Sequence, residues 1–227
     1  MYKNKQFSKL EKQYNKYQEG GSVGLMMDIC HKGLEIKNNG LDKTSNILEI
    51  GAGTSPHIKY INHDYKNYFF LENSNFAIKY LKKNLKGLKN IKFKFYKNNS
   101  IPFKKNSFDR IIISHVLEHI PNPENYLSQM FGLLRKGGIL SIALPNDPGF
   151  LWRFGRYLLK IHKVKKVLKM TAAEYDYMIA TEHINSIFNL ISIIKYKYSN
   201  KIVDEKYLPF KVKNIDLNLF YNITLRK

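Results

Sequence analysis

The chain has 227 residues, of which 44% are hydrophobic, so it can build one domain around a sizeable core. Its single cysteine, Cys30, excludes an internal disulfide framework. The sequence shows no secretory signal, and no apolar run approaches the roughly 20 residues that span a bilayer, so we expect a cytoplasmic protein. The formal net charge of +20 comes from lysines spread along the whole chain, so it indicates a solvated lysine surface rather than a nucleic-acid groove, and it favours an anionic substrate or an acidic membrane surface.

The predicted elements change in character along the chain. Residues 1–44 predict a polar, helical cap interrupted at Gly20-Gly21, and from residue 45 short apolar runs alternate with helical segments. Strands are predicted at 46–53, 67–73, 91–96, 108–114 and 138–145, and helices at 75–85 and 122–138. Pro123 suits the first turn of the second helix, and Gly137-Gly138 suits its end. This alternation is typical of a parallel, doubly wound α/β sheet with right-handed crossovers.

The regular alternation ends at residue 145. Residues 146–190 predict a helical insertion after the fifth strand, and residues 191–227 predict the strands that complete the sheet. The last of these, at 217–227, is expected to complete a mixed sheet at its edge. We expect the segments 1–44, 45–145, 146–190 and 191–227 to form one domain.

A glycine turn follows the first predicted strand, where open α/β sheets bind ligands. Gly51 and Gly53 carry no Cβ, so their backbone can turn tightly and approach a ligand closely. Glu72 ends the second strand 21 residues after Gly51, where a carboxylate can accept hydrogen bonds from both hydroxyls of a ribose. Pro56 stands where a dinucleotide motif needs a third glycine. The residues thus favour a ligand that has adenosine but no pyrophosphate.

Three stretches carry a resemblance to a known family. They are "ILEIGAGTSPH", "FFLENS" and "NNSIPFKKNSFDRIIISHVLEHIPNPENYLSQMFGLLRKGGILSIALPN", and they span roughly residues 45–145. Together they resemble the class I S-adenosylmethionine-dependent methyltransferases. The resemblance implies a Rossmann-like, mostly parallel seven-stranded sheet with an antiparallel edge strand, helices on both faces, and S-adenosyl-L-methionine as cofactor, released as S-adenosyl-L-homocysteine.

The resemblance also implies which residues contact the cofactor. They are Glu49, Gly51, Ala52, Gly53, Glu72, Asn73, Asn98, Asn99, Ser100, Ser114 and His115. The first strand's turn would line the methionine and ribose, Glu72 would hold the ribose hydroxyls, and the backbone at the end of the fourth strand would meet the methionine ammonium. The loop at residues 98–100 has Asn98 and Asn99 where the family often has an acid for the adenine, and Ser55 replaces the family's frequent third glycine, so the chain departs from the pattern at both places.

The stretch from His115 to His119 spells H-x-x-E-H, which can also mark a zinc peptidase. A peptidase needs both histidines on one continuous helix, whereas His115 ends a predicted strand and two prolines follow His119. Some quinone O-methyltransferases resemble this stretch and bind a divalent ion through an acid-rich version of it. Because His115 replaces one of those acids, we expect no metal here.

Methyl transfer mainly requires the acceptor to be aligned with the methyl group, and a hydroxyl acceptor also benefits from a base. His119 is expected to lie nearest the methyl group, with His115 and His183 as competing candidates. Each of these histidines could instead be a hydrogen-bonded structural residue.

The insertion is where this fold commonly builds its acceptor pocket. Basic residues at helical spacing, including Arg153 and Arg156, run beside an apolar stripe at 154, 158, 161, 164 and 168. This helix could lie on an anionic membrane, bind a phosphorylated acceptor, or serve as a lid packed on the core. The expected acceptor-binding residues are Arg153, Arg156, Tyr175, Tyr177 and His183.

The sequence therefore predicts a cytoplasmic S-adenosylmethionine-dependent O-methyltransferase that could make peripheral contact with an anionic inner membrane face. The insertion resembles enzymes encoded with bacterial surface-polysaccharide genes, which implies a sugar-like or phosphate- or phosphoramidate-bearing acceptor. The alternatives are a basic module that binds the cofactor without catalysis, and a methyltransferase for a quinone-type molecule or nucleic acid. The fourth strand is not followed by the N/D-P-P-Y/F-type tetrapeptide of base N-methylation, so nucleic acid is not the expected acceptor.

Overall fold

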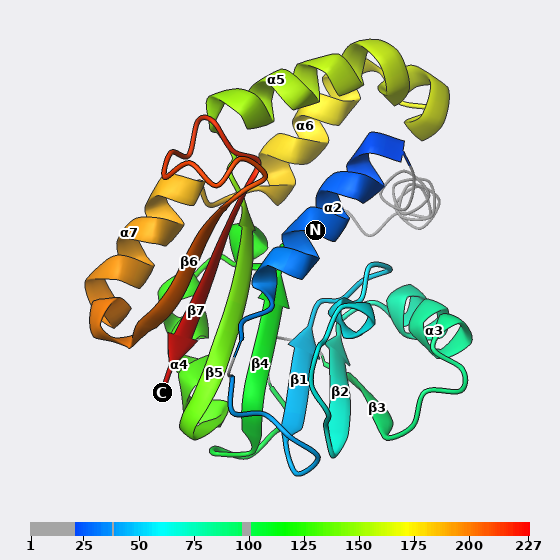
Figure 1. Ribbon diagram of the computed structural model, residues 1–227. Helices are drawn as coiled ribbons and strands as arrows, with labels where there is room; N and C mark the ends of the chain where they lie inside the picture. The colour runs from blue at the N-terminus through cyan, green and yellow to red at the C-terminus, as the bar shows by residue number, and fades with distance from the viewer. Residues whose placement is uncertain (1–20, 38, 97–100) are drawn as a thin grey trace.

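The computed structural model describes residues 21–37, 39–96 and 101–227 (Figure 1). The described strands are β1 (Asn46–Ile50), β2 (Asn67–Glu72), β3 (Ile91–Phe95), β4 (Phe108–Ser114), β5 (Leu134–Pro145), β6 (Ile202–Leu208) and β7 (Phe220–Arg226). The described helices are α2 (Gly21–Leu34), α3 (Asn75–Asn84), α4 (Pro123–Leu133), α5 (Phe150–Leu159), the π-helical η3 (Lys160–Leu168), α6 (Ala172–Glu182) and α7 (Ile187–Tyr198), with short 3-10 turns η1 (His57–Lys59), η2 (Leu117–His119) and η4 (Ser199–Lys201).

The strands form one seven-stranded sheet in the order β3-β2-β1-β4-β5-β7-β6. Strands β1 to β5 run parallel, and β7 pairs antiparallel with both β5 and β6. The predicted Rossmann-like, mostly parallel sheet with antiparallel pairing at one side is therefore confirmed. One detail differs, because the closing strand β7 lies one position inside the edge and β6 lies outside it.

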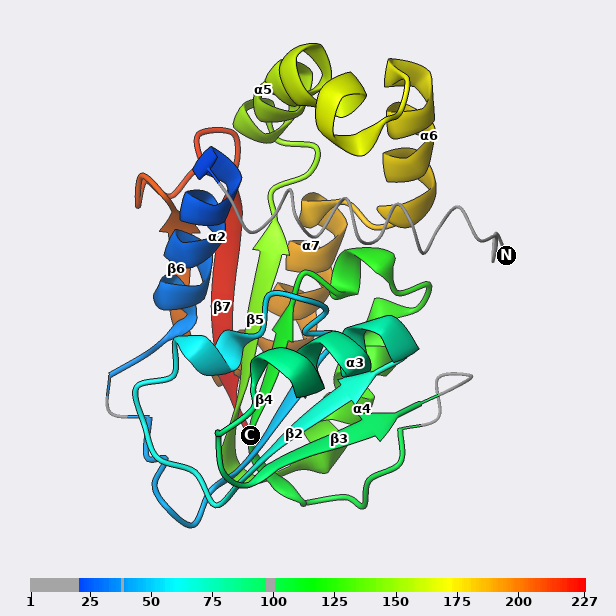
Figure 2. The same ribbon diagram turned by 90° about the vertical axis from the view of Figure 1, so that its right-hand side faces the viewer.

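Helices cover both faces of the sheet, as predicted (Figures 1 and 2). On one face α2 and α3 pack over a core that includes Cys30, Leu34 and Leu81. On the other face α4 and α7 bury their apolar sides in a second core. The helix residues of this second core are Tyr126, Leu127, Met130, Leu133, Ile187, Leu190 and Ile194. The strand residues between these layers are buried on both sides, which explains the continuous apolar runs of β1 and β4.

The helix α4 begins as its sequence predicts and ends earlier than expected. The Asn122 side chain accepts a hydrogen bond from the Asn125 backbone N–H, and Pro123 occupies the first turn. The helix ends at Leu133 because Leu134 is extended and already pairs with Phe108 in the sheet. The glycine pair at 137–138 thus lies within β5, and the prediction that it ends the helix is wrong.

The segment predicted as an insertion, residues 146–190, divides between a helical part with its own small core and the start of α7, which packs on the main sheet. Helices α5, η3 and α6 extend beyond the carboxyl ends of β4 and β5 (Figures 1 and 2), and they enclose a small core of Val164, Leu168, Tyr175 and Ile179. The predicted boundary at residue 190 falls inside α7, whose buried face belongs to the core under the main sheet. Among the described residues, no helix is both long enough and apolar enough to cross a bilayer.

Candidate active site at the carboxyl ends of the parallel strands

The loop after β1 has the backbone geometry that its glycines predict. Gly51 and Gly53 have φ angles of +68° and +56°, a region that favours glycine. A Cβ on Gly51 would stand 2.6 Å from Val116 Cγ2, whereas one on Gly53 would meet no atom within 4 Å. The Glu72 carboxylate reaches this loop from β2 and accepts a hydrogen bond from the Gly53 backbone N–H at 2.9 Å. The loop and the acid expected to hold a ribose therefore lie side by side.

Glu49 occupies a different place from the one predicted. Its side chain is buried behind the glycine loop, where one carboxylate oxygen accepts from the His57 backbone N–H at 2.6 Å and the other from the Tyr68 hydroxyl at 2.6 Å. Burial raises the pKa of Glu49 to about 7. Glu49 therefore anchors the end of the loop from inside the protein and does not line a cofactor surface.

The surroundings of the loop fit a polar ligand. The Ser114 Oγ atom at the end of β4 is buried without a hydrogen-bond partner in the protein, which is costly unless a ligand or water supplies one. A cavity of about 510 Å³ borders the loop, lined in part by Asp28 of α2, by Thr54 and Ser55, and by Tyr80 of α3. A second cavity of about 840 Å³ is lined by residues between 36 and 64, which precede β1 and β2 in the chain. It therefore lies at the amino ends of these strands, away from the glycine loop.

The other predicted cofactor residues are placed as follows. Ala52 is half-buried within the glycine loop, and Asn73 is exposed directly after β2. His115 follows Ser114 at the end of β4. Asn98, Asn99 and Ser100 lie outside the described residues.

Comparison with known proteins identifies the family. The family model described as a methyltransferase domain matches residues 41–191, about two thirds of the chain. The chain belongs to the methyltransferase-domain family. The predicted S-adenosylmethionine-dependent methyltransferase is thereby confirmed at the level of family and cofactor. No curated protein matches the chain in sequence.

Three solved structures show how widely this fold is shared. The N-methyltransferase NodS from Bradyrhizobium japonicum WM9, in complex with S-adenosyl-L-homocysteine, is 15% identical over 99% of both chains, with a TM-score of 0.61. A SAM-dependent methyltransferase from Aquifex aeolicus is 15% identical over 94% of this chain and 96% of that one, with a TM-score of 0.60. The CurJ carbon methyltransferase is 16% identical over 94% of this chain, with a TM-score of 0.61, and this chain spans 57% of its length. At these identities the likeness shows the fold alone.

The H-x-x-E-H stretch of this methyltransferase does not form a peptidase helix. His115 directly follows β4 in a left-handed conformation with φ of +54°, and only the short turn η2 spans Leu117–His119. The His115 ring contacts Cys30, with 3.6 Å between Nε2 and Sγ, and meets the Phe220 ring edge-on. Burial lowers the pKa of His115 to about 3. His115 thus packs against the core with its side chain 20% exposed, which is no less accessible than His183, whose side chain is 14% exposed.

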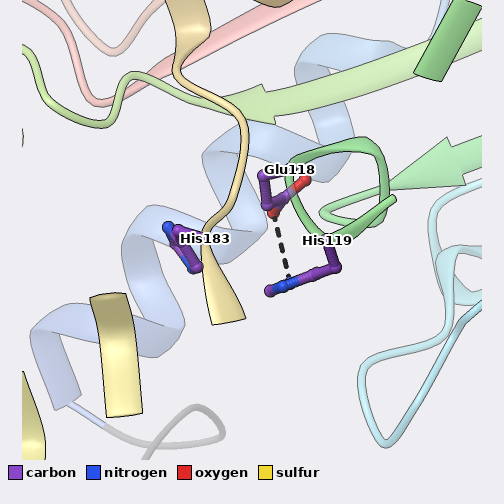
Figure 3. Close-up of side chains that lie close together, drawn as sticks. All are labelled: Glu118, His119 and His183. Atoms are coloured by element: carbon purple, nitrogen blue, oxygen red, sulfur yellow. Dashed lines mark ion pairs between the residues drawn. The ribbon is translucent and has the colours of Figure 1, made fainter. Parts of the chain in front are cut away.

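The other two histidines lie beside Glu118 (Figure 3), with their ring centroids 5.1 Å apart in an edge-to-face arrangement. One ligand-type atom from each of Glu118, His119 and His183 lies within 4.8 Å of the others. The Glu118 side chain is 2% exposed, its Oε1 lies 3.8 Å from His119 Nε2, and its Oε2 has no hydrogen-bond partner. Burial raises the pKa of Glu118 to about 8. We call these three residues the Glu118 cluster.

Both histidines of the Glu118 cluster are oriented through their Nδ1 atoms. His119 Nδ1 lies 2.7 Å from the Glu182 carbonyl oxygen, to which it donates. His183 Nδ1 lies 2.8 Å from Asp147 Oδ2 and donates to that carboxylate. Arg156 also pairs with Asp147, at 3.2 Å. Burial opposes ionisation of Asp147, but the His183 hydrogen bond and the Arg156 charge lower its pKa overall.

A clamp joins the two segments that supply the Glu118 cluster. The Asn185 side chain donates to the Leu117 and Ile120 carbonyl oxygens at 3.0 and 2.7 Å, and its backbone N–H donates to the Glu118 carbonyl oxygen at 3.0 Å. These three bonds tie the turn after α6 to η2. The position of His183 relative to Glu118 is therefore fixed by backbone contacts as well as by its own side chain.

The predicted acceptor residues do not all converge on one place. His183 and Arg156 meet at Asp147, whereas Arg153 is exposed on α5. The two tyrosines also separate, since Tyr175 is buried in the small core of the insertion and Tyr177 is 61% exposed.

Asp147, which both His183 and Arg156 contact, was not among the residues predicted from the sequence. Asp147 lies two residues after the end of β5. Its place just beyond the carboxyl end of a parallel strand is the signal that could have revealed it.

Proposed function

We propose that this methyltransferase transfers a methyl group from S-adenosylmethionine to an oxygen of a small, polar, hydroxyl-bearing acceptor. The observation that carries the proposal is the hydrogen-bonded pair of His183 and Asp147 beside Glu118 and His119, beyond the carboxyl ends of β4 and β5. An uncharged amine already offers a nucleophilic lone pair, whereas a neutral hydroxyl becomes a good nucleophile only when a base takes its proton.

The cofactor-binding part of the site consists of the loop after β1 and the ends of β2 and β4. Glu72 would hold the ribose hydroxyls, Gly51 and Gly53 would let the backbone approach the ligand, and Ser114 would offer its unpartnered hydroxyl. When bound, S-adenosylmethionine supplies a methyl group on a sulfonium, which is a good leaving group. These side chains bind and orient, and none of them has to take part in covalent chemistry.

His183 is the proposed base. Because Asp147 accepts the hydrogen bond from Nδ1, the lone pair of the neutral ring lies on Nε2, which can take a proton from the acceptor hydroxyl. Asp147, with its lowered pKa, stays ionised and stabilises the imidazolium that forms. His119 would hydrogen-bond the same acceptor. This assignment moves the principal role from His119, the first choice on sequence, to His183.

The acceptor we propose is a sugar-like or phosphate-bearing precursor, as in surface-polysaccharide synthesis. The exposed side chains of Arg153, Lys165 and Lys166 place positive charge on the insertion, and an arginine pairs well with phosphate. The same segment exposes an apolar stripe of Phe154, Leu158 and Ile161. An apolar stripe flanked by basic residues is typical of helices that lie on anionic membranes, so a lipid-linked precursor would suit this surface.

The test is an assay for S-adenosyl-L-homocysteine release with a panel of sugars, nucleotide-sugars and phosphorylated sugars, and with amines as competing acceptors. We expect turnover with a hydroxyl-bearing acceptor that falls about 100-fold or more in His183→Ala, while calorimetry shows unchanged S-adenosylmethionine binding. The matched control is His162→Ala, which removes an exposed histidine of η3. Turnover confined to amine acceptors, or an unaffected His183→Ala enzyme, would overturn the proposal.

A further inference from the structure

We propose that Glu118, His119 and His183 form a binding site for a divalent transition-metal cation such as Zn²⁺, Co²⁺ or Mn²⁺. No metal was predicted from the sequence, because His115 replaces one of the acids of the metal-binding version of the motif; the structure adds His183 of the insertion as a further candidate ligand. Binding of the cation is independent of the proposed O-methylation, and only the role of the bound cation rests on that function.

The first support is the donor set. Two imidazoles and one carboxylate are ligands that zinc, cobalt and manganese accept in proteins. The candidate ligand atoms lie within 4.8 Å of one another, and Figure 3 shows the three side chains converging from two segments. Ligands around such an ion stand about 2.0–2.2 Å from it, so the three atoms would have to move closer together when a cation binds.

The second support is the orientation of the two imidazoles. A metal-binding histidine usually donates its other ring N–H to a carboxylate or a backbone carbonyl. Here Nδ1 of His183 donates to Asp147 and Nδ1 of His119 donates to the Glu182 carbonyl. Both rings therefore present Nε2, with its lone pair, as the remaining ligand atom. Hydrogen bonds of this kind fix the tautomer and orientation of metal-binding histidines and raise their basicity.

The third support comes from Glu118 itself. This carboxylate is almost fully buried, and its Oε2 atom has no hydrogen-bond partner in the protein. Leaving a buried carboxylate oxygen unpartnered is costly, and coordination to a cation would satisfy it. His115 Nδ1 also lies 3.7 Å from Glu118 Oε1, but the opposite nitrogen of that ring contacts Cys30, so we do not assign it as a ligand.

Three protein ligands leave at least one position open, as in catalytic rather than structural metal sites. An acceptor hydroxyl that bound there would be acidified by the cation. The cation and a proton compete for His183 Nε2. With the cation bound, His183 would act as a ligand and not as the base, and the proton of the acidified hydroxyl would pass to solvent.

The direct experiment uses the tag-free, full-length chain after treatment with a chelator. Titration with Co²⁺ should produce visible absorption bands of a bound ion at one equivalent, and competition with Zn²⁺ should remove them. We expect His183→Ala and Glu118→Gln each to weaken Co²⁺ binding about tenfold or more, and Asp147→Asn to weaken it about 10- to 100-fold. The control His162→Ala should leave the binding unchanged.

Two outcomes would overturn the proposal. One is the absence of stoichiometric Co²⁺ absorption in wild-type protein whose circular dichroism shows it to be folded. The other is equal Co²⁺ affinity in His183→Ala and His162→Ala, which would show that the ion binds elsewhere. Intact Co²⁺ binding together with turnover confined to amines would refute the O-methylation and leave the metal site standing, so the two proposals fail separately.

Discussion

Asp147 and His183 lie 36 residues apart and form a 2.8 Å hydrogen bond between a carboxylate that follows a strand and a histidine that follows a helix. The bond determines which nitrogen of His183 faces the space beside Glu118 and His119. It also links the Rossmann-like core to the inserted helices, because β5 belongs to the first and α6 to the second.

Replacing Asp147 by asparagine should therefore reduce turnover without reducing cofactor binding. The amide carries no charge to stabilise an imidazolium, and its NH₂ group can donate to Nδ1 and so move the ring proton to Nε2. We expect kcat to fall about 100-fold or more, with the affinity for S-adenosylmethionine unchanged in calorimetry. Asp176→Asn, which removes an exposed acid of α6, is the control. Equal losses in both variants would point to a general disturbance of the insertion.

Replacing Glu72 should weaken cofactor binding without changing the rate of the methyl-transfer step. Hydrogen bonds to a charged group contribute about 1.5–3 kcal/mol, so Glu72→Ala should weaken S-adenosylmethionine binding about 10- to 100-fold. Calorimetry with S-adenosylmethionine and S-adenosyl-L-homocysteine measures the change directly. The exposed Glu124 of α4 offers the comparison variant Glu124→Ala. Unchanged affinity in Glu72→Ala would remove this acid from the proposed ribose site.

Alanine at Gly51 should lower the unfolding free energy more than alanine at Gly40, a glycine of similar backbone conformation. At Gly51 an added Cβ would meet Val116 at 2.6 Å, whereas Gly40, with φ of +77°, has no atom within 4 Å of that position. Both substitutions introduce backbone strain of about 1–3 kcal/mol, and only the first adds a clash. Urea denaturation should show a larger loss of unfolding free energy for Gly51→Ala. Equal losses would mean that Val116 moves aside.

Acid should weaken the protein partly through Glu35. Burial acts to raise the pKa of Glu35, but hydrogen bonds and charge from His57 and Arg110 lower it from 4.5 to about 2. A depressed folded-state pKa gives stability that is present above the unfolded value and is lost as the pH falls from about 4.5 toward 2. The shift corresponds to about 3 kcal/mol as an order of magnitude.

The measurement for Glu35 is the pH dependence of the unfolding free energy. Glu35→Gln should be less stable than wild type at neutral pH, and the difference should shrink between about pH 5 and pH 2 as the wild-type carboxylate becomes protonated. Asp64→Asn, at an exposed acid before β2, should follow the wild-type curve. A constant gap over this range would contradict the lowered pKa.

The exposed stripe on α5 and η3 makes the proposed membrane interaction testable. Phe154 and Leu158 are 48% and 40% exposed, so replacing both by serine should leave thermal stability nearly unchanged. We expect the double variant to lose co-sedimentation with vesicles that contain anionic lipid, and neither protein to bind neutral vesicles. Tyr196→Ser removes an 89% exposed aromatic side chain of α7 and controls for nonspecific adsorption of exposed hydrophobic groups to the vesicles. Equal sedimentation of all variants would exclude this surface as the contact.

The core of the fold was predictable because its signals are local. Apolar runs at β1, β2, β4 and β5 reveal buried parallel strands, and Gly51 and Gly53 occupy the positive-φ positions that the turn after β1 requires. The end of α4 was misplaced because the pairing of Leu134 with Phe108, a contact between two residues that are distant in the sequence, outweighs the local signal of a glycine pair.

The site was only partly predictable because its contacts join distant segments. The sequence indicated that Glu72 serves the loop after β1, but it could not show that Glu49 turns inward toward His57 and Tyr68. Nor could it show that His183 approaches Glu118, since the order of residues does not reveal where an inserted helix returns.

The apolar stripe predicted in the insertion divides into two parts for the same reason. Val164 and Leu168 pack against α6 in the small core, while Phe154, Leu158 and Ile161 stay exposed. Helical spacing predicts that these residues share a side of the helix, but only the position of α6 decides which of them are covered.

The Asn185 clamp means that the proposed catalytic side chains are brought together when the chain folds. Its three hydrogen bonds hold the turn after α6 against η2 through contacts within the protein alone. The entropy of bringing the two segments together is thus lost once, during folding, and not again in each catalytic cycle. At the proposed site an incoming acceptor would meet side chains that are already in place, so its binding free energy could go into alignment with the methyl group.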